Sequence, residues 1–207
     1  MNDLTGPFIC GIDEAGRGPL AGPVCAASVV LPAVLPADFP SGILNDSKKL
    51  SPRNRNKAAE LIFQKALAWG IGWASPAEID EMNILRASLL AMSRSYKDMT
   101  GRFEYLLESP QVSGRLEAVI DGLYVPELPL KARALVKADQ KIPAVMAASI
   151  LAKTARDRMM VRYSWLYPEY GYEKHKGYPT KAHRECIARY GFSPIQRRSF
   201  TVKGVHE

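Results

Sequence analysis

The sequence predicts an α/β fold in which helices flank a mixed β-sheet, with a small helical part at the C-terminus. Five short apolar runs bounded by turn residues have the length of strands, and longer segments between and after them have helical periodicity. The first two runs lie close together in the chain, which favours antiparallel pairing. A helix-sized segment precedes the fourth run, and such a crossover favours parallel strands.

The N-terminal part of the chain supplies three of these strands and one helix. Residues 8–12 and 24–31 are apolar and end at charged residues or proline, and residues 68–74 alternate as a strand does. Ser51 and Pro52 have the identities of a helix N-cap and a first-turn residue. The helix that follows carries apolar residues on one face: Ala58, Leu61, Ile62 and Ala66.

The second helix has a clear start and an apolar stripe. Ser75, Pro76 and Glu78 have the identities of the N-cap, first residue and third residue of a capping box. Apolar residues then repeat at spacings of three and four: Met82, Leu85, Leu89, Met92 and Tyr96. This stripe is too short for a coiled-coil seam and predicts a helix that packs on the core.

The C-terminal half adds the remaining strands and helices. Residues 116–120 and 132–136 are the last two apolar runs. A long helix is expected over 143–163, because its first half is apolar and small on all sides, as in a helix buried against a sheet. A short helix is expected over 181–190, with Gly191 as its C-terminal stop.

We expect one domain over residues 1–165 and a basic helical segment, 166–207, packed on it. Residues 167–183 hold four tyrosines interleaved with basic side chains. The basic residues are Lys174, His175, Lys176 and Lys181. Such mixtures combine phosphate contacts with surfaces on which a sugar or base stacks. A solvated C-terminal face is the alternative interpretation.

Composition narrows the class of protein and its compartment. Hydrophobic residues make up 47% and charged residues 24% of the 207 positions, which is typical of a soluble globular protein. The net charge of +7 favours a polyanionic partner. The three cysteines are scattered, which predicts a reducing compartment and neither disulfides nor a zinc site. The N-terminus lacks signal-peptide features and prolines interrupt the uncharged run 18–37, so we expect a cytoplasmic protein without a membrane span.

Carboxylates stand at or just beyond the ends of three apolar runs. Asp13 and Glu14 follow the first run, Asp121 follows the fourth, and Asp139 comes after the fifth at a helix entry. In a compact mixed sheet these ends can converge, and oxygen ligands suit Mg²⁺ or Mn²⁺. Two such ions would clamp the attacking water and the leaving oxygen of a phosphodiester. Each aspartate taken singly is equally typical of a turn.

Six motifs spread over nearly the whole chain carry a resemblance to a known family. They are DEAGRGPLAGPV (13–24), DSKKL (46–50), IDEMNIL (79–85), AASILAKTARD (147–157), YGYEKHKGYPT (170–180) and RRSF (197–200). Their sequences and order resemble ribonuclease HII, the bacterial type 2 ribonuclease H family.

The resemblance implies a ribonuclease H-like catalytic domain and a C-terminal substrate-binding segment. It also implies Mg²⁺- or Mn²⁺-dependent, two-metal-ion cleavage of RNA in RNA–DNA hybrids and 5′ to single ribonucleotides embedded in duplex DNA. The products would carry a 3′-hydroxyl and a 5′-phosphate, as in the first step of ribonucleotide excision repair. We expect the protein to act as a monomer.

The resemblance also assigns residues. The family's catalytic and metal-binding carboxylates map onto Asp13, Glu14, Asp121 and Asp139. Its ribose-reading loop maps onto Gly16, Arg17 and Gly18, and its sugar-stacking tyrosine onto Tyr178. The same motifs contain the other substrate-binding candidates: Lys48, Asn83, Lys153, His175 and Lys176. The sequence departs from the family's usual residues at Leu123, Ala138 and Tyr172.

Two other functions are compatible with parts of this pattern. A DNA-junction resolvase or transposase-like nuclease can share the fold and the acidic metal site. The glycine loop with Tyr178 disfavours it, because reading a 2′-hydroxyl needs such a loop. A non-catalytic nucleic-acid-binding module predicts metal-independent binding without cleavage products.

Overall fold

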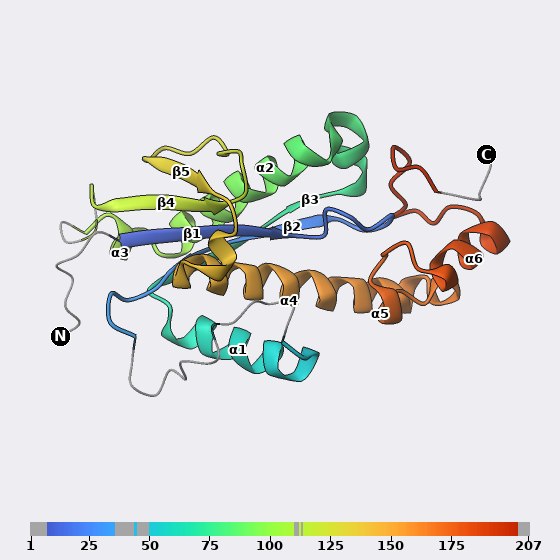
Figure 1. Cartoon of the computed structure of the whole chain (residues 1–207), viewed down its shortest axis with the longest axis horizontal. Helices are drawn as coiled ribbons and strands as arrows, with labels where there is room; N and C mark the ends of the chain where they lie inside the picture. Colours follow the sequence, from blue (N-terminus) through green and yellow to red (C-terminus); the bar gives the residue numbers. More distant parts are fainter. Residues whose placement is uncertain (1–7, 36–43, 45–49, 110–111, 113, 203–207) are drawn as a thin grey trace.

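A five-stranded mixed sheet forms the centre of the molecule (Figure 1). The structure, a computed structural model, describes residues 8–35, 44, 50–109, 112 and 114–202. The strands lie in the order β3-β2-β1-β4-β5. Their bounds are β1 (Phe8–Ala15), β2 (Val24–Val30), β3 (Ala68–Ala74), β4 (Leu116–Asp121) and β5 (Ala132–Leu135). The first three strands pair antiparallel, whereas β4 is parallel to β1 and β5 to β4, so the predicted mixed sheet is confirmed.

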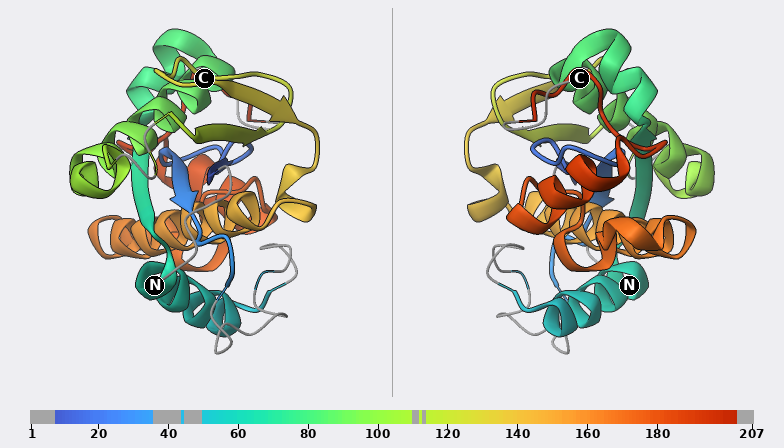
Figure 2. Two further views of the ribbon diagram at one scale, coloured as in Figure 1. Left: turned by 90° about the vertical axis from the view of Figure 1, so that its left-hand side faces the viewer. Right: turned by 90° about the vertical axis from the view of Figure 1, so that its right-hand side faces the viewer.

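Helices cover both faces of the sheet. The element bounds are α1 (Pro52–Lys65), α2 (Pro76–Arg102), α3 (Glu104–Leu107), η1 (Ala138–Gln140), α4 (Pro143–Leu166), η2 (Pro168–Tyr170), α5 (Tyr172–His175) and α6 (Lys181–Tyr190). Helix α2 packs on one face, and α4 packs on the other with α1 beyond it (Figure 2). Two apolar cores therefore lie on either side of β1 and β2, and they hold these strands from both faces.

The predicted helix starts are confirmed in detail. The Ser51 hydroxyl accepts a hydrogen bond from the backbone N–H of Asn54 at the start of α1. At the start of α2, the Ser75 hydroxyl accepts from the Glu78 N–H, and the Glu78 carboxylate accepts from the Ser75 N–H. Gly191 ends α6 as expected. These caps satisfy amide groups that have no partner inside the helix.

One local prediction needs correction and another needs refinement. Strand β1 does not end before the carboxylates: its pairing with β2 continues to Ala15 opposite Cys25, so Asp13 and Glu14 lie within the strand. The α2 stripe packs on the core as predicted, with Met92 buried and Met82, Leu89 and Tyr96 partly buried against it, but it is not the most buried face of the helix. Small residues of α2 lie closest to the sheet, against glycines of β3. A Cβ on Gly72 would lie 2.1 Å from the Ala91 carbonyl oxygen, so glycine permits this close approach.

The C-terminal segment packs on the end of α4 and returns to the loop after β1. The Gly177 carbonyl accepts a hydrogen bond from the Leu20 N–H at 2.8 Å, and Ala21 forms an isolated bridge with Gln196. Figure 1 shows α5 and α6 at the far end of α4. The division into 1–165 and 166–207 stays a prediction. Among the described residues, no helix has the length and apolarity needed to cross a bilayer.

Candidate active site

Three aspartates meet where β1, β4 and η1 come together. Asp13 lies in β1, Asp121 is the last residue of β4, and Asp139 lies in η1. Because β1 and β4 are parallel neighbours with Ile12 opposite Ile120, Asp13 and Asp121 emerge at the same level of the sheet. One carboxylate oxygen from each of the three aspartates lies within 4.8 Å of the others. The three aspartates therefore converge as expected, although Asp13 comes from inside its strand and only Asp121 from a strand end.

Asp121 also positions the segment that carries Asp139. Its Oδ1 accepts a hydrogen bond of 2.7 Å from the backbone N–H of Ala138. Ala138 is fully buried and packs against Val119 and Val145, so a methyl group fits where the family usually has glycine. This contact ties the end of β4 to the start of η1. The departure at Ala138 therefore leaves Asp139 beside Asp121.

Glu14 belongs to the same hollow. We call it the carboxylate hollow; it has a volume of about 250 Å³ and includes Asp13, Glu14 and Asp121. Its other lining residues are Ala15, Gly16, Arg17, Gly18, Ser149, Lys153 and Tyr178. The Glu14 carboxylate pairs with the Arg17 guanidinium at 3.3 Å. Four separate parts of the chain, 13–18, 121, 149–153 and 178, thus surround one small space that includes three carboxylates.

The electrostatics of the carboxylate hollow favour a bound cation. Burial, followed by the negative charge of Glu14, raises the pKa of Asp13 well above its usual value, although a hydrogen bond with Ser149 opposes this. Burial also raises the pKa of Glu14, against the opposing charge of Arg17. Buried like charges are costly unless a positive charge offsets them. The carboxylate oxygens form the kind of ligand set that Mg²⁺ and Mn²⁺ prefer.

Two buried arginines hold the glycine loop, residues 16–23, beside these carboxylates. Arg197 donates from Nε to the Gly22 carbonyl (2.8 Å), from Nη1 to Arg17 (2.9 Å) and from Nη2 to Gly16 (2.6 Å). Arg156 donates to the carbonyls of Pro23, Lys176 and Ala21 at 2.9, 3.0 and 3.1 Å. Both arginines are fully buried. Each guanidinium therefore satisfies three backbone carbonyls outside the strands, and Arg156 also ties the loop to Lys176 of the C-terminal segment.

Gly16 needs its lack of a side chain at this position. Its φ is +97°, which side-chain-bearing residues rarely adopt. A Cβ there would lie 1.9 Å from the Arg156 Nε. The close packing of the loop on Arg156 thus depends on glycine.

Tyr178 stands over the other side of the loop. Its side chain is 39% exposed, and a Cβ on Gly18 would lie 3.8 Å from its ring. The Lys153 Nζ lies 5.6 Å from the ring centroid, and the Arg156 guanidinium carbon lies 6.0 Å from it. The ring is thus a partly exposed flat surface, next to cations and within the same hollow as the carboxylates.

Comparison with known proteins decides the family. The family model described as ribonuclease HII matches residues 10–203. The chain belongs to the ribonuclease HII family. It is 53% identical over 205 residues to the ribonuclease HII of Treponema denticola, covering 96% of this chain and 100% of that one. Ribonuclease HII enzymes are endoribonucleases that cleave RNA in RNA–DNA hybrids, so this chain is an endoribonuclease.

Solved structures agree on the fold. Ribonuclease H2 from Pyrococcus horikoshii is 28% identical, with a TM-score of 0.68 over 94% of both chains. Bst-RNase HIII in complex with Mn²⁺ has the same TM-score of 0.68 over 91% of this chain and 64% of that one. At 18% identity, the second likeness shows the fold alone. The expected ribonuclease H-like fold is confirmed.

The other residues that the family resemblance selected lie at different distances from the hollow. Lys153 lines it and pairs with Asp157 at 2.8 Å. Asn83 does not line it: this residue breaks α2 with a φ of 72°, and its Oδ1 caps the N–H groups of Leu85 and Arg86. Lys48 lies outside the described residues. The roles of these residues in binding stay predictions.

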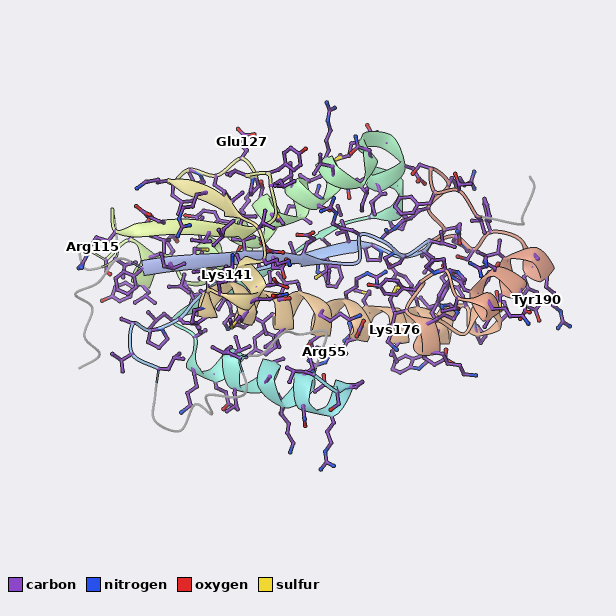
Figure 3. The ribbon with its side chains drawn as sticks, in the orientation of Figure 1. Arg55, Arg115, Glu127, Lys141, Lys176 and Tyr190 are labelled. Atoms are coloured by element: carbon purple, nitrogen blue, oxygen red, sulfur yellow. The ribbon has the colours of Figure 1, made fainter. Side chains whose placement is uncertain are left out.

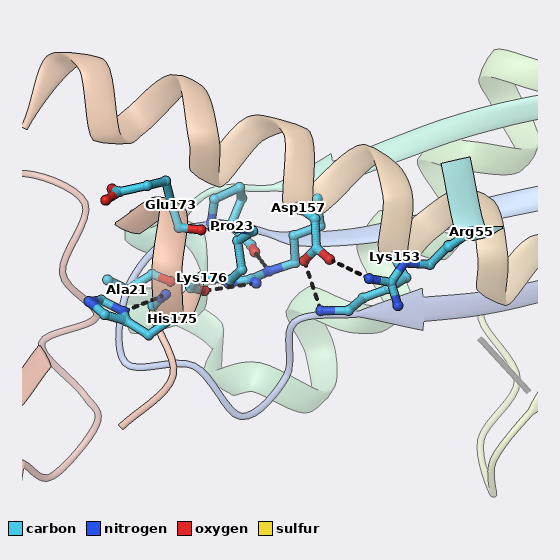
Figure 4. Close-up of polar contacts among 10 residues, drawn as sticks. Ala21, Pro23, Arg55, Lys153, Asp157, Glu173, His175 and Lys176 are labelled. Carbon is cyan, nitrogen blue, oxygen red and sulfur yellow. Dashed lines mark hydrogen bonds and ion pairs between the residues drawn. The ribbon is translucent and has the colours of Figure 1, made fainter. Parts of the chain in front are cut away.

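His175 and Lys176 shape the turn that presents Tyr178. The His175 Nε2 lies 2.8 Å from the Tyr170 carbonyl oxygen, and its Nδ1 accepts from the Gly177 N–H at 3.2 Å. Lys176 contacts the Glu173 carbonyl through its Nζ (Figure 4). Neither side chain lines the carboxylate hollow in the structure. The hydrogen bonds of both side chains are to other residues of the C-terminal segment.

Arg156 and Arg197 are the residues that the sequence analysis missed. Both lie in motifs that carried the family resemblance, AASILAKTARD and RRSF. Arg156 belongs to the charged half of a long helix, where exposed arginines are usual. No local pattern marks it as buried. The only available signal was its membership of a motif.

Proposed function

We propose that this protein hydrolyses the phosphodiester 5′ to a ribonucleotide, in RNA–DNA hybrids and at single ribonucleotides embedded in duplex DNA. The products carry a 3′-hydroxyl and a 5′-phosphate, and the protein acts as a monomer in cytoplasmic ribonucleotide repair. The observation that carries the proposal is the meeting of three aspartate oxygens within 4.8 Å beside the glycine loop and Tyr178.

The carboxylates supply the ligands for divalent cations. Asp13, Glu14, Asp121 and Asp139 would hold Mg²⁺ or Mn²⁺, because their buried like charges need a cation and the ligand atoms are all oxygens. When bound, such ions supply Lewis-acid chemistry that activates water and stabilises the leaving oxygen. The hydrogen bond between Asp121 and the Ala138 N–H keeps two of these carboxylates together before substrate arrives.

The glycine loop recognises the ribose. Because the 2′-hydroxyl is what distinguishes RNA from DNA, the protein must bring hydrogen-bonding groups close to a sugar. Gly18 leaves the backbone open to such an approach, because a Cβ there would meet only the Tyr178 ring at 3.8 Å. Gly16 instead packs its bare face on Arg156. Arg197 already holds the carbonyls of Gly16 and Arg17, so the shape of the loop is set before binding. Preorganised groups bind more tightly because less freedom is lost on binding.

Tyr178 positions the sugar next to that ribose. Its partly exposed ring stands beside Gly18, where a deoxyribose can pack on its face and an extra hydroxyl would be crowded. Lys153 lines the same hollow with its Nζ 5.6 Å from the centroid of this ring, where it can contact the phosphate backbone.

A duplex DNA with one ribonucleotide tests the proposal directly. We expect one cut, 5′ to the ribonucleotide, only when Mg²⁺ or Mn²⁺ is present, with a 3′-hydroxyl and a 5′-phosphate at the ends. Asp139→Asn is the inactive control, because an amide keeps the shape but not the charge that a hard cation needs. Cutting of an all-DNA duplex, or cutting in EDTA, would contradict the proposal.

Tyr178 variants test how a lone ribose is selected. Tyr178→Phe removes one hydrogen-bonding group and should cost about 1 kcal/mol in kcat/KM. Tyr178→Ala also removes the stacking surface and should cost about 1–3 kcal/mol more. Both losses should be larger on a single embedded ribonucleotide than within a long RNA tract, where the neighbouring sugar is also ribose. Equal losses on both substrates would make Tyr178 a general packing residue.

A further inference from the structure

A second hollow lies directly beyond the carboxylate hollow, between the start of α1 and the second half of α4. We call it the basic groove; it has a volume of about 370 Å³. The lining residues that matter here are Arg55, Asp157, Arg158, Arg162, Trp165 and Lys176. Figure 3 shows Arg55 on α1 and Lys176 near α5, both beside α4. Of the lining residues, only Lys176 was among the substrate-binding candidates that the family resemblance selected, and the proposed chemistry does not use the groove.

The basic groove carries an excess of positive charge. Its lining contains four cationic side chains and one carboxylate, Asp157. That carboxylate already pairs with Arg55 at 3.2 Å and Lys153 at 2.8 Å (Figure 4). The Arg158 guanidinium donates to the neutral Asn56 amide oxygen at 3.2 Å. Within the described ranges, Arg158, Arg162 and Lys176 form no ion pair, so the groove is suited to an anion.

Two further features indicate that the anion is a phosphate joined to a sugar or a planar base. Helix α1 starts at Pro52 on the groove wall and has no acidic residue in its first turn, so the positive end of the helix lies at the groove. Trp165 lines the groove and is 75% exposed. An exposed indole gives a stacking surface for a base or sugar. Cations, a helix start and an exposed ring together match a nucleotide unit better than a free ion.

The groove neighbours the carboxylate hollow through residues that contact each other or lie close in the chain. Lys153 lines the carboxylate hollow and pairs with Asp157, which lines the groove. Lys176 lines the groove, and Tyr178, two residues later, lines the hollow. Along α4, Lys153 and Arg162 are nine residues apart, which is roughly 14 Å at the helical rise. A nucleic acid bound at the carboxylates therefore reaches the groove within about four nucleotides, at roughly 3.4 Å of axial rise each.

We infer that the basic groove binds a backbone phosphate of the substrate duplex about four nucleotides from the scissile bond, with Trp165 packing on the adjoining sugar or base. The inference rests on the proposed function, because the substrate must enter by the carboxylates. The groove thus sets how long a duplex arm must be for tight binding. It reads no sequence, since phosphate contacts position a duplex without reading its bases.

A charge-neutralising double variant tests the groove. We compare Arg158→Gln/Arg162→Gln with Lys97→Gln/Arg102→Gln, which removes two charges from α2 on the opposite face of the sheet. Binding is measured by fluorescence anisotropy in EDTA, so that the duplex is not cut. The groove variant should bind a long duplex roughly tenfold more weakly, and its salt slope should fall by about 1–2. The α2 variant should bind as the wild type does.

Duplex length locates the contact. Two nested series of duplexes are shortened from either end toward the ribonucleotide. In one series, the wild type should lose roughly tenfold in affinity once fewer than about four nucleotides remain, and the groove variant should then bind equally well. Equal behaviour of the groove and α2 variants at every length overturns the inference. If the wild type binds but cuts no ribonucleotide-containing duplex, the proposed function fails instead, and the length series still judges the groove.

Trp165 fluorescence separates a backbone phosphate from a free anion. Trp165→Phe identifies the part of the signal that comes from this indole. The long duplex should quench it at the concentrations at which anisotropy reports binding, and the short duplex should not. Quenching by inorganic phosphate at micromolar concentration that the duplex does not displace would make the groove a free-anion site and would overturn the inference.

Discussion

The carboxylate hollow and the arginine anchors behind the glycine loop are both clusters of buried charge, but they are built in opposite ways. Asp13 lies among like charges, which together with burial raise its pKa. Arg156 and Arg197 lie among backbone carbonyls, and each donates three hydrogen bonds. The protein leaves the first cluster electrostatically strained and satisfies the second completely.

Under the proposed function, this difference separates groups kept for a ligand from groups kept for the fold. A cluster of buried carboxylates lowers stability until a cation arrives. A guanidinium with three carbonyl partners stabilises the loop at all times, because removing it would leave buried acceptors without donors. Variants in the two clusters should therefore change activity and stability in different combinations.

Asp13→Asn should lower cleavage more than substitutions at Arg197 or His183 do, but it should raise stability in the absence of metal. Loss of a ligand charge removes several kcal/mol of transition-state stabilisation, so cleavage in Mg²⁺ should fall by about 10³-fold or more. In EDTA the variant should melt higher, by about 2–4 °C for each kcal/mol of repulsion relieved. Single-turnover cleavage and calorimetry check the two halves. A lower melting temperature in EDTA would make Asp13 a structural carboxylate.

Arg197→Met should lower the stability of the protein, and the loss of stability should in turn lower its activity. Three buried carbonyls lose their donor at about 1 kcal/mol or more each, so the free energy of unfolding should fall by about 3 kcal/mol or more. Urea unfolding measures this. Arg198→Met is the matched control, because the neighbouring side chain is exposed. If the two variants unfold at the same urea concentration, Arg197 is not an anchor of the glycine loop.

His183 gives a smaller effect that depends on pH. It is fully buried, its Nδ1 lies 3.0 Å from the Tyr178 carbonyl oxygen, and its ring stacks on His175. Burial lowers the pKa of His183 to about 4. At pH values between the pKa of about 6.5 in the unfolded chain and the pKa of about 4 in the folded protein, the unfolded chain binds one proton more than the folded protein does. The contribution of His183 to stability should therefore be fully present above pH 6.5. The free energy of unfolding should fall by about 1–2 kcal/mol by pH 5.

His183→Asn tests that pH dependence. Asparagine keeps an N–H that can donate to the Tyr178 carbonyl but does not titrate. The free energy of unfolding of both proteins is measured with urea at several pH values. The wild-type value minus the variant value should fall by about 1–2 kcal/mol as the pH falls from 6.5 to 5. A constant difference over this range would show that His183 does not titrate on unfolding.

Local patterns in the sequence determined most of the architecture. Apolar runs of strand length, two serine caps and a terminal glycine placed the strands and helices, because these signals act over a few neighbouring residues. Carboxylates at the ends of such runs also indicated the acidic site. Its composition of aspartate and glutamate, without cysteine or histidine, already specified hard divalent cations.

Only the tertiary structure decided which charges are buried and what they hold. Arg197 donates to the Gly16 carbonyl across 181 residues of chain, and Arg156 to Pro23 across 133. The buried face of α2 was likewise decided by glycines of β3, whose missing side chains let small residues approach. Periodicity reports which residues of one element share a face. It does not report the atoms that another element brings to that face, and those atoms determine whether a buried arginine is tolerated.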